Sequence, residues 1–116
     1  MADLDGVLAG EAIEAVTAVL QALALPLRLR IVLGILDGEA TAAELADRLD
    51  VGYATLAQHL RHLRLAGLVL RRRAGNRVRY VAAPSTAVLV RAIVAEVAPA
   101  AGGGSRTQVG GARPRA

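Results

Sequence analysis

The densest group of chemically active side chains in this sequence is a set of arginines between residues 71 and 79. Five guanidinium groups occupy nine positions with no acidic residue among them, and they flank Ala74-Gly75-Asn76, a turn signal. Like charges on adjacent and cross-strand positions destabilise a purely structural hairpin. A polyanion removes that repulsion, because phosphates neutralise guanidinium groups and release condensed counterions. The pattern therefore predicts a β-hairpin that binds a polyanion through Arg71, Arg72, Arg73, Arg77 and Arg79.

A second set of polar side chains precedes this hairpin, in the segment Val51 to Gly67. Leu56, Leu60 and Leu63 recur at i, i+4 and i+7, which places them on one stripe of a helix facing a core. The other side carries short side chains beside an amide and guanidinium groups. Such a face can approach base edges and phosphates in a major groove. An ordinary solvated helix shows the same pattern, but the basic hairpin favours DNA. The predicted contacts are Tyr53, Ala54, Thr55, Ala57 and Gln58 near bases and Arg61 and Arg64 near phosphates.

Charge is unevenly divided along the chain. Residues 1–50 contain three arginines and nine acidic residues, whereas residues 51–116 contain eleven arginines and one acidic residue, Glu96. This asymmetry indicates a polyanionic partner for the second half. A membrane surface is the competing polyanion, but the basic side chains lie on a hairpin and on the polar side of a helix whose apolar side is needed for a core. Double-stranded DNA is therefore the predicted partner.

The preceding segments predict the elements that would position this surface. Apolar residues recur at helical spacing from about Val7 to Leu25, and after a proline a second helix is predicted from Leu27 to Asp37. Thr41-Ala42-Ala43-Glu44 is a capping box that begins a third, short helix. A tight turn then leads to the polar helix, with Gly52 at its N-cap. Two helices joined in this way form a helix-turn-helix.

Two of the predicted helices are too apolar to be buried within one small domain. The stretch from Pro84 to about Ala98 carries apolar residues on adjoining helical rows and only two charges, and the first helix is similarly apolar. Unpaired, they would expose a large apolar patch. We therefore predict that they pair across a twofold axis in a homodimer; the alternative is that both cover their own core. The predicted interface residues are Ile13, Val16, Leu20, Leu89, Ile93 and Val97.

In order and spacing, four segments resemble the winged helix-turn-helix of the ArsR/SmtB transcriptional regulators. They read ALALPLRLRIVLGIL, TAAELADRL, ATLAQHLRHLRLAGLV and RRAGNRVRYV, and they span about Leu20 to Val81. The resemblance implies a mainly α fold of about five helices with a small two-stranded hairpin as the wing, and a dimer built from the first and last helices. It departs from the family at the second helix, where Leu25 and Leu27 replace polar residues of a junction that commonly reads Asp-Pro-Thr-Arg.

The same resemblance implies a function. It implies a sequence-specific transcriptional regulator that binds an inverted-repeat promoter site as a homodimer, with the polar helix in the major groove and the wing on the flanking backbone or minor groove. The competing class is a helical dimerisation module whose basic wing binds an acidic protein. A protein co-regulator is a further partner consistent with the basic surface.

Many members of this family bind a metal that changes their affinity for DNA. The resemblance places such sites at cysteines in the helix before the recognition helix, or at aspartate and histidine residues in the last helix. Here the first location carries Ala42 and Ala43, and the last helix has neither residue type, so neither site can be carried over. His59 and His62, spaced i, i+3, are an alternative chelate for Ni(II) or Zn(II) if a carboxylate completes the shell. His59 is more simply a packing or DNA-backbone residue.

Composition argues against several other classes. The chain has no cysteine, which removes disulfides, thiolate ligands and thiol redox sensing. Both histidines lie on the predicted DNA helix, and no nucleophile, base and orienting group can be assembled, so no enzyme is predicted. With no membrane-length apolar run and no signal peptide, a cytoplasmic protein is expected. We predict a flexible start at residues 1–6, one domain at residues 7–98 and a disordered tail rich in Gly, Ala and Arg at residues 99–116.

Overall fold

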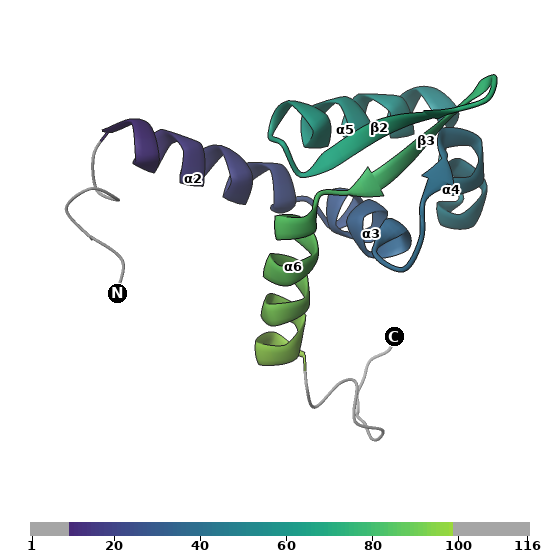
Figure 1. Cartoon of the computed structure of the whole chain (residues 1–116). Helices are drawn as coiled ribbons and strands as arrows, with labels where there is room; N and C mark the ends of the chain where they lie inside the picture. The colour runs from purple at the N-terminus through teal and green to yellow at the C-terminus, as the bar shows by residue number, and fades with distance from the viewer. Residues whose placement is uncertain (1–9, 99–116) are drawn as a thin grey trace. The chain divides into compact units, whose positions relative to one another are not determined.

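The structure is a computed structural model that describes residues 10–98 (Figure 1). The chain divides into two units between Pro84 and Ser85. The predicted flexible start and the predicted tail lie outside the described residues. The described helices are α2 (Gly10–Leu23), α3 (Pro26–Ile35), α4 (Ala42–Leu49), α5 (Tyr53–Leu65) and α6 (Pro84–Val97), and the strands are β1 (Ala40–Thr41), β2 (Val69–Ala74) and β3 (Arg77–Ala82).

The chain turns sharply between α2 and α3. Leu25 is extended (φ −102°, ψ 132°) and is the N-cap of α3, but no side chain caps this helix. The helix begins at Pro26, one residue earlier than predicted, because proline at the first helical position has a suitable φ and no N–H to leave unsatisfied. The two helices lie at 89° to each other. No single described helix is long and apolar enough to cross a membrane; only the bent pair of α2 and α3, taken together, reaches that length and hydropathy.

The predicted helix-turn-helix is confirmed in α4 and α5. The Glu44 amide donates to Thr41 Oγ1 at 3.1 Å, and the Thr41 amide donates to Glu44 Oε1 at 2.9 Å, which completes the capping box of α4. Asp50 ends α4 in the left-handed region (φ 55°), which an aspartate tolerates better than most side chains. Gly52 is then the N-cap of α5, as predicted. The capped start of α4 and its left-handed end at Asp50 together fix where α5 begins.

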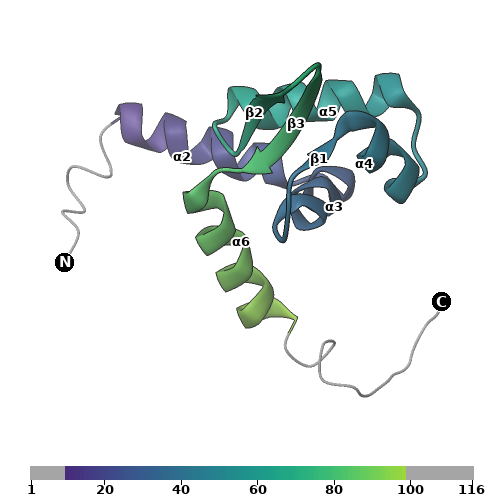
Figure 2. The ribbon, with the colours of Figure 1, turned by 45° about the vertical axis from the view of Figure 1, so that its right-hand side comes forward.

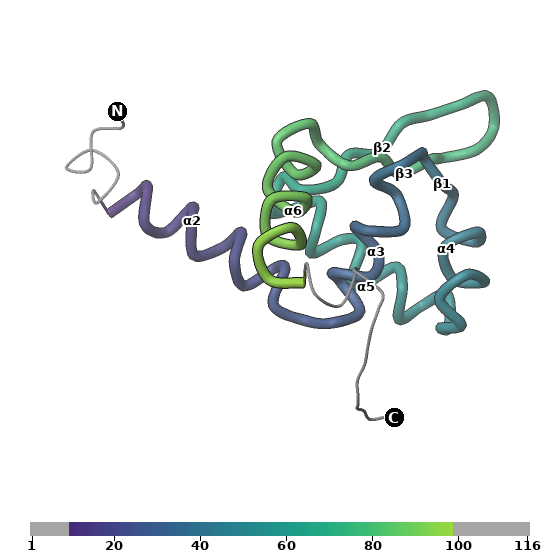
Figure 3. Tube along the Cα trace, turned by 90° about the horizontal axis from the view of Figure 1, so that it is seen from below, coloured from purple at the N-terminus to yellow at the C-terminus, as the bar shows by residue number. Residues whose placement is uncertain are grey.

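The wing is a hairpin of β2 and β3 joined by Gly75 and Asn76. Gly75 has a φ of +65°, whereas Asn76 does not have a positive φ. Positive φ at the first turn residue alone is the pattern of a type II′ turn, which matches the twist of a two-stranded hairpin. Figure 2 shows the hairpin beside α5, which β2 contacts. In Figure 3 the turn extends away from α3, α4 and α5.

A third strand joins the two that were predicted. β1 pairs antiparallel with β3, with Ala40 opposite Tyr80 and Thr41 opposite Arg79, so the strand order is β1-β3-β2. Two residues are too few to show an alternating pattern, which is why the sequence does not reveal this strand. Its consequence is that the residues around the start of α4 are held directly against the wing.

The core of the first unit confirms the leucine stripe of α5. Leu56, Leu60 and Leu63 are at most 1% exposed. They pack in the layer formed by α3, α4 and β2, all of which contact α5. Because the leucines occupy the inner side of the helix, its other side is left to face solvent. Other large side chains in this core are Ile31, Val32, Ile35, Leu45, Leu68 and Val69.

Candidate nucleic-acid interface

The outer face of α5 carries the side chains that the sequence predicted for DNA. Tyr53, at the first position of the helix, is 63% exposed. Ala54, Thr55, Gln58 and Arg61 are also exposed, and Ala57 and Arg64 are half-buried. The face therefore combines short side chains with an exposed amide and an exposed guanidinium, as base and phosphate recognition requires.

The five wing arginines differ in their surroundings. Arg71, Arg73 and Arg77 are exposed, and among residues 10–98 none of the three forms an ion pair. Arg72, in contrast, pairs with Glu39, and Arg79 lies with its Nε 3.8 Å from Glu39 Oε1. The sequence showed no acid within the arginine run, and this shared partner, Glu39, comes from the segment before α4.

The strand register explains why this acidic partner is needed. Arg72 lies directly opposite Arg79 in the β2–β3 ladder, a like-charge pair that destabilises a sheet. The pairing of β1 with β3 brings Glu39 and Glu44 to the same place, where Arg79 Nη1 lies 3.5 Å from Glu44 Oε1. These pairs are partly exposed and each contributes little to stability. Their geometric effect is to tie the middle of the wing to the start of α4.

The Glu44 carboxylate has a pKa below its ordinary value. The main cause is the hydrogen bond from the Thr41 amide, and Arg79 and Arg48 lower the pKa further, while burial acts in the opposite direction. Glu44 is therefore negatively charged at neutral pH. It can serve as the helix cap and as a partner of Arg79 at the same time.

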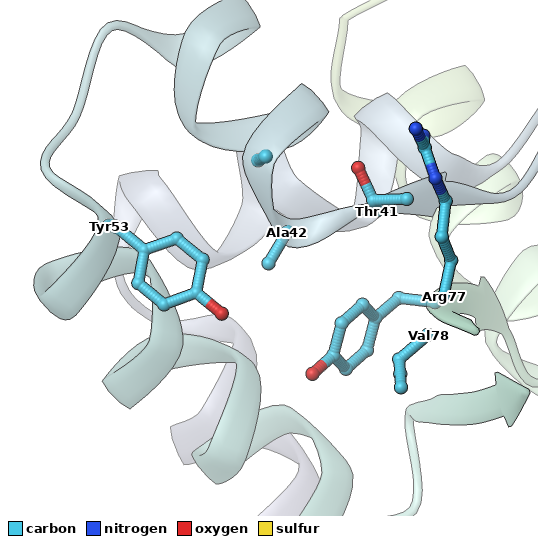
Figure 4. A pocket seen from close by; sticks show the side chains of 7 residues that line it. Thr41, Ala42, Tyr53, Arg77 and Val78 are labelled. Carbon is cyan, nitrogen blue, oxygen red and sulfur yellow. The ribbon is translucent and has the colours of Figure 1, made fainter.

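An open cleft of about 450 Å³ lies between the start of α5 and the wing. Figure 4 shows Tyr53, from the start of α5, across the cleft from Arg77 and Val78 of β3, with Thr41 and Ala42 between them. Two predicted DNA contacts, one from each element, thus line one groove. A phenol hydroxyl and an exposed guanidinium on its walls are suited to a backbone phosphate. Tyr80 also lines the cleft, and no motif or spacing in the sequence singles it out as a contact.

His59 connects α5 to α3. Arg28 Nε donates a hydrogen bond to His59 Nδ1 at 3.0 Å, so that nitrogen carries no proton. Burial lowers the pKa of His59, and the positive charges of Arg28 and His62 lower it further. This is the packing role that the sequence favoured over a metal ligand. Across residues 10–98 no three His, Cys, Asp or Glu side chains are grouped to hold a metal ion, so the described residues do not complete a site around His59 and His62.

The lowered pKa of His59, caused mainly by its burial, predicts a pH-dependent stability. The pKa of His59 is lower in the folded chain than its ordinary value of 6.5, so the unfolded chain binds more protons between those two values. The free energy of unfolding should therefore fall as the pH drops through 6.5 toward the folded pKa. Urea unfolding at a series of pH values measures it. The His59→Gln variant should lose most of this dependence, and full retention would show that another group titrates.

A helix-turn-helix followed by a basic antiparallel hairpin defines a winged helix-turn-helix protein. Comparison with known proteins agrees: residues 19–72 match the family model described as a helix-turn-helix domain. The chain belongs to the ArsR/SmtB family of winged helix-turn-helix regulators.

Three similar proteins support this assignment. Over 70 residues the chain is 39% identical to the HTH-type transcriptional repressor SmtB of Mycobacterium tuberculosis, a match that covers 60% of this chain and 52% of that protein. The chain thus spans about half the length of that curated relative. The transcriptional repressor BigR of Xylella fastidiosa is 30% identical, with a TM-score of 0.68 and coverage of 84% and 97%. A homodimeric winged helix-turn-helix DNA-binding domain from Mycobacterium bovis, described as a possible ArsR-family regulator, is 27% identical, with a TM-score of 0.71 and coverage of 94% and 97%.

Proposed function

We propose that this chain is a transcriptional regulator that binds an inverted-repeat promoter site as a homodimer. In this proposal the protein is located in the cytoplasm and has no enzymatic activity. The observation that carries the proposal is the cleft in which the exposed start of α5 meets the wing, with Tyr53 and Arg77 on facing walls. If α5 lies in a major groove, α5 and the wing both contact the same stretch of DNA. The similar proteins SmtB and BigR are named as transcriptional repressors, and promoter occupancy is the simplest route to repression.

In this proposal α5 and the wing contact different parts of the DNA. Gln58 can form a bidentate hydrogen bond with adenine, and the short side chains of Ala54 and Thr55 beside it allow close approach to the base edges. Arg61 and Arg64 contact phosphates and set the register of the helix. The exposed wing arginines contact the flanking backbone or a narrow minor groove.

The homodimer is supported by apolar side chains that the single chain leaves in solvent. Leu20 on α2 is 55% exposed and Val97 on α6 is 79% exposed. Ile13, Val16 and Ile93 are exposed as well, and Leu89 is half-buried. A second copy of the chain would cover these side chains through a twofold axis. Because protein symmetry is mirrored in the operator, the half-sites should lie about one helical turn apart.

Changing Gln58 tests the reading of bases. Gln58→Ala should reduce the preference for the operator over a scrambled duplex by about 1–3 kcal/mol, because one bidentate base contact is lost. Affinity for the scrambled duplex should not change, since the phosphate contacts remain. Fluorescence anisotropy measures the affinity of each protein for the operator and for the scrambled duplex. An acidic-protein binder would show no operator preference to lose.

The two classes of wing arginine predict different salt dependence. Arg77→Ala removes an exposed guanidinium and should make the slope of log affinity against log salt shallower by about one unit. Arg72 already pairs with Glu39, so Arg72→Ala should change the slope by less. Titrations at four salt concentrations measure both slopes. An unchanged slope for Arg77→Ala would remove the wing from the DNA contact.

A response to Ni(II) or Zn(II), for which the sequence offers His59 and His62 as the alternative chelate, stays a prediction. It is tested by adding each ion, and separately EDTA, to the operator titration. A change in operator affinity that EDTA reverses would establish a metal-dependent regulator. Identical affinities in all samples would exclude that class of effector.

A further inference from the structure

A second cavity, of about 240 Å³ and open to solvent, lies among α2, α3 and α5 in the first unit of the chain. Its apolar lining comes from Ala18, Ala22, Leu65 and Ala66, and its polar lining is formed by Gln21, Arg28 and His62. It shares no lining residue with the cleft at the wing. The proposed DNA contacts therefore leave this cavity unexplained.

Within residues 10–98, several donor groups around this cavity have no hydrogen-bond acceptor. Arg28 uses its Nε for His59, and in the described part of the chain neither of its terminal nitrogens has a hydrogen bond or an ion pair. Gln21 and His62 are exposed, and within residues 10–98 their side chains form no hydrogen bond or ion pair either. The cavity lining includes no acidic residue. A guanidinium, an amide and an imidazole around one small space provide a positive, donor-rich site for an anion.

We propose that this cavity binds a small aliphatic carboxylate. The carboxylate accepts hydrogen bonds from the terminal nitrogens of Arg28, with Gln21 and His62 as further donors. Its alkyl chain lies against Leu65 and the alanines of α2. A water occupies about 30 Å³ of liquid, so the cavity has room for roughly eight non-hydrogen atoms. That size fits an acid of about three to six carbons.

The cavity stays accessible in the proposed homodimer. Successive residues of an α-helix are about 100° apart, so residues two positions apart lie on nearly opposite sides. Ala18 and Ala22 line the cavity, whereas Val16 and Leu20 are exposed and belong to the predicted interface. Covering the interface side of α2 therefore leaves its cavity side open.

The position of the cavity suggests how a ligand would act. Helix α5 supplies His62 and Leu65 to the cavity, carries the proposed phosphate contacts Arg61 and Arg64 at the same end, and carries the proposed base contacts at its N-terminal end. A carboxylate on Arg28 also neutralises the guanidinium that is hydrogen-bonded to His59 of the same helix. This regulatory step rests on the proposed function, whereas the binding site does not.

Titration of the ¹⁵N-labelled full chain with sodium butanoate at constant ionic strength tests the site. Saturable changes in NMR chemical shift are expected for the backbone amides of residues 18–22 and 62–66. Butan-1-ol has the tail without the charge and should bind at least about tenfold more weakly, since a hydrogen-bonded charge contributes about that factor. Inorganic phosphate has charge without the tail and should also bind at least about tenfold more weakly, since it lacks the alkyl chain whose burial contributes a similar factor. No saturable shifts with butanoate, or equal binding of either comparison compound, would overturn the proposal.

Variants then assign the binding to this cavity. Arg28→Gln should weaken butanoate binding by about tenfold or more, whereas Arg30→Gln, which removes an exposed arginine from the same helix, should change it less than about twofold. Because Arg28 also holds His59, Ala18→Leu provides a second route: it fills the cavity and keeps the arginine. Equal binding by wild type and Ala18→Leu, or equal losses for Arg28→Gln and Arg30→Gln, would contradict the site.

Operator affinity measured with and without saturating butanoate tests the regulatory step. A change of about fivefold or more is expected, a typical coupling between linked sites. Butanoate binding with unchanged operator affinity would overturn the coupling and leave the site intact. A protein that binds butanoate but no operator would instead refute the proposed function, so the two failures are distinguishable.

Discussion

Replacing Leu20 with glutamate should separate the homodimer into monomers and weaken operator binding by about a hundredfold or more. Leu20 is 55% exposed on α2 and belongs to the predicted apolar interface. A carboxylate placed there loses its water on dimerisation without gaining a partner, which is strongly unfavourable. A monomer also loses the gain in avidity from two linked half-sites, commonly a factor of about 10²–10⁴. Sedimentation velocity and operator titration measure the two effects.

Ala15→Glu is the matched control for this prediction. Ala15 is also exposed on α2, but it lies about 140° around the helix from Leu20. The same charge at that position should leave the dimer and its operator affinity unchanged. If Leu20→Glu remained dimeric, or if both variants became monomeric, the proposed interface would be wrong.

Leu60→Ala should lower the free energy of unfolding by about 2–5 kcal/mol. Leu60 is 1% exposed and lies at the centre of the leucine stripe of α5. Truncation removes apolar burial and leaves a cavity among neighbours that relax only partly. In a domain of ordinary stability, about 5–15 kcal/mol, this is a large fraction of the total. Urea unfolding followed by circular dichroism measures it.

Leu65→Ala provides the comparison on the same helix. Leu65 is 71% exposed, so the identical change should cost less than about 1 kcal/mol. Similar losses for both variants would mean that α5 is not packed through the stripe that the structure shows. Its outward face would then not be the one proposed for DNA.

Local patterns in the sequence predicted much of this fold. The Thr41–Glu44 capping box depends on residues three apart, and the leucine stripe of α5 depends on residues three and four apart, so each is visible within a short window. The hairpin follows from a glycine between two basic, β-branched runs. Each prediction succeeded because the interactions that decide the structure are close in sequence.

The remaining features depend on residues far apart in the chain. Arg72 and Glu39 are 33 residues apart, and Arg28 and His59 are 31 apart. Only the pairing of β1 with β3 and the packing of α3 against α5 bring these groups together. The sequence therefore showed five similar wing arginines, whereas the fold divides them into three that form no ion pair within residues 10–98 and two with acidic partners.

That division bears on how the wing would work. Arg72 and Arg79 pair with acidic groups beside the start of α4, which holds the strands in place. Arg77, next to the turn, lines the cleft opposite Tyr53. We expect the paired arginines to position the wing and the exposed arginines to supply the charge that meets phosphate.

The central claim is tested most directly by titrating the purified protein against its own upstream promoter and a scrambled duplex of equal length, at two salt concentrations. We expect a preference for the promoter that persists at the higher salt, because base contacts do not depend on counterion release in the way that phosphate contacts do. Equal binding to both duplexes that disappears at the higher salt would contradict sequence-specific recognition, and would reduce this surface to a basic patch that binds an acidic partner.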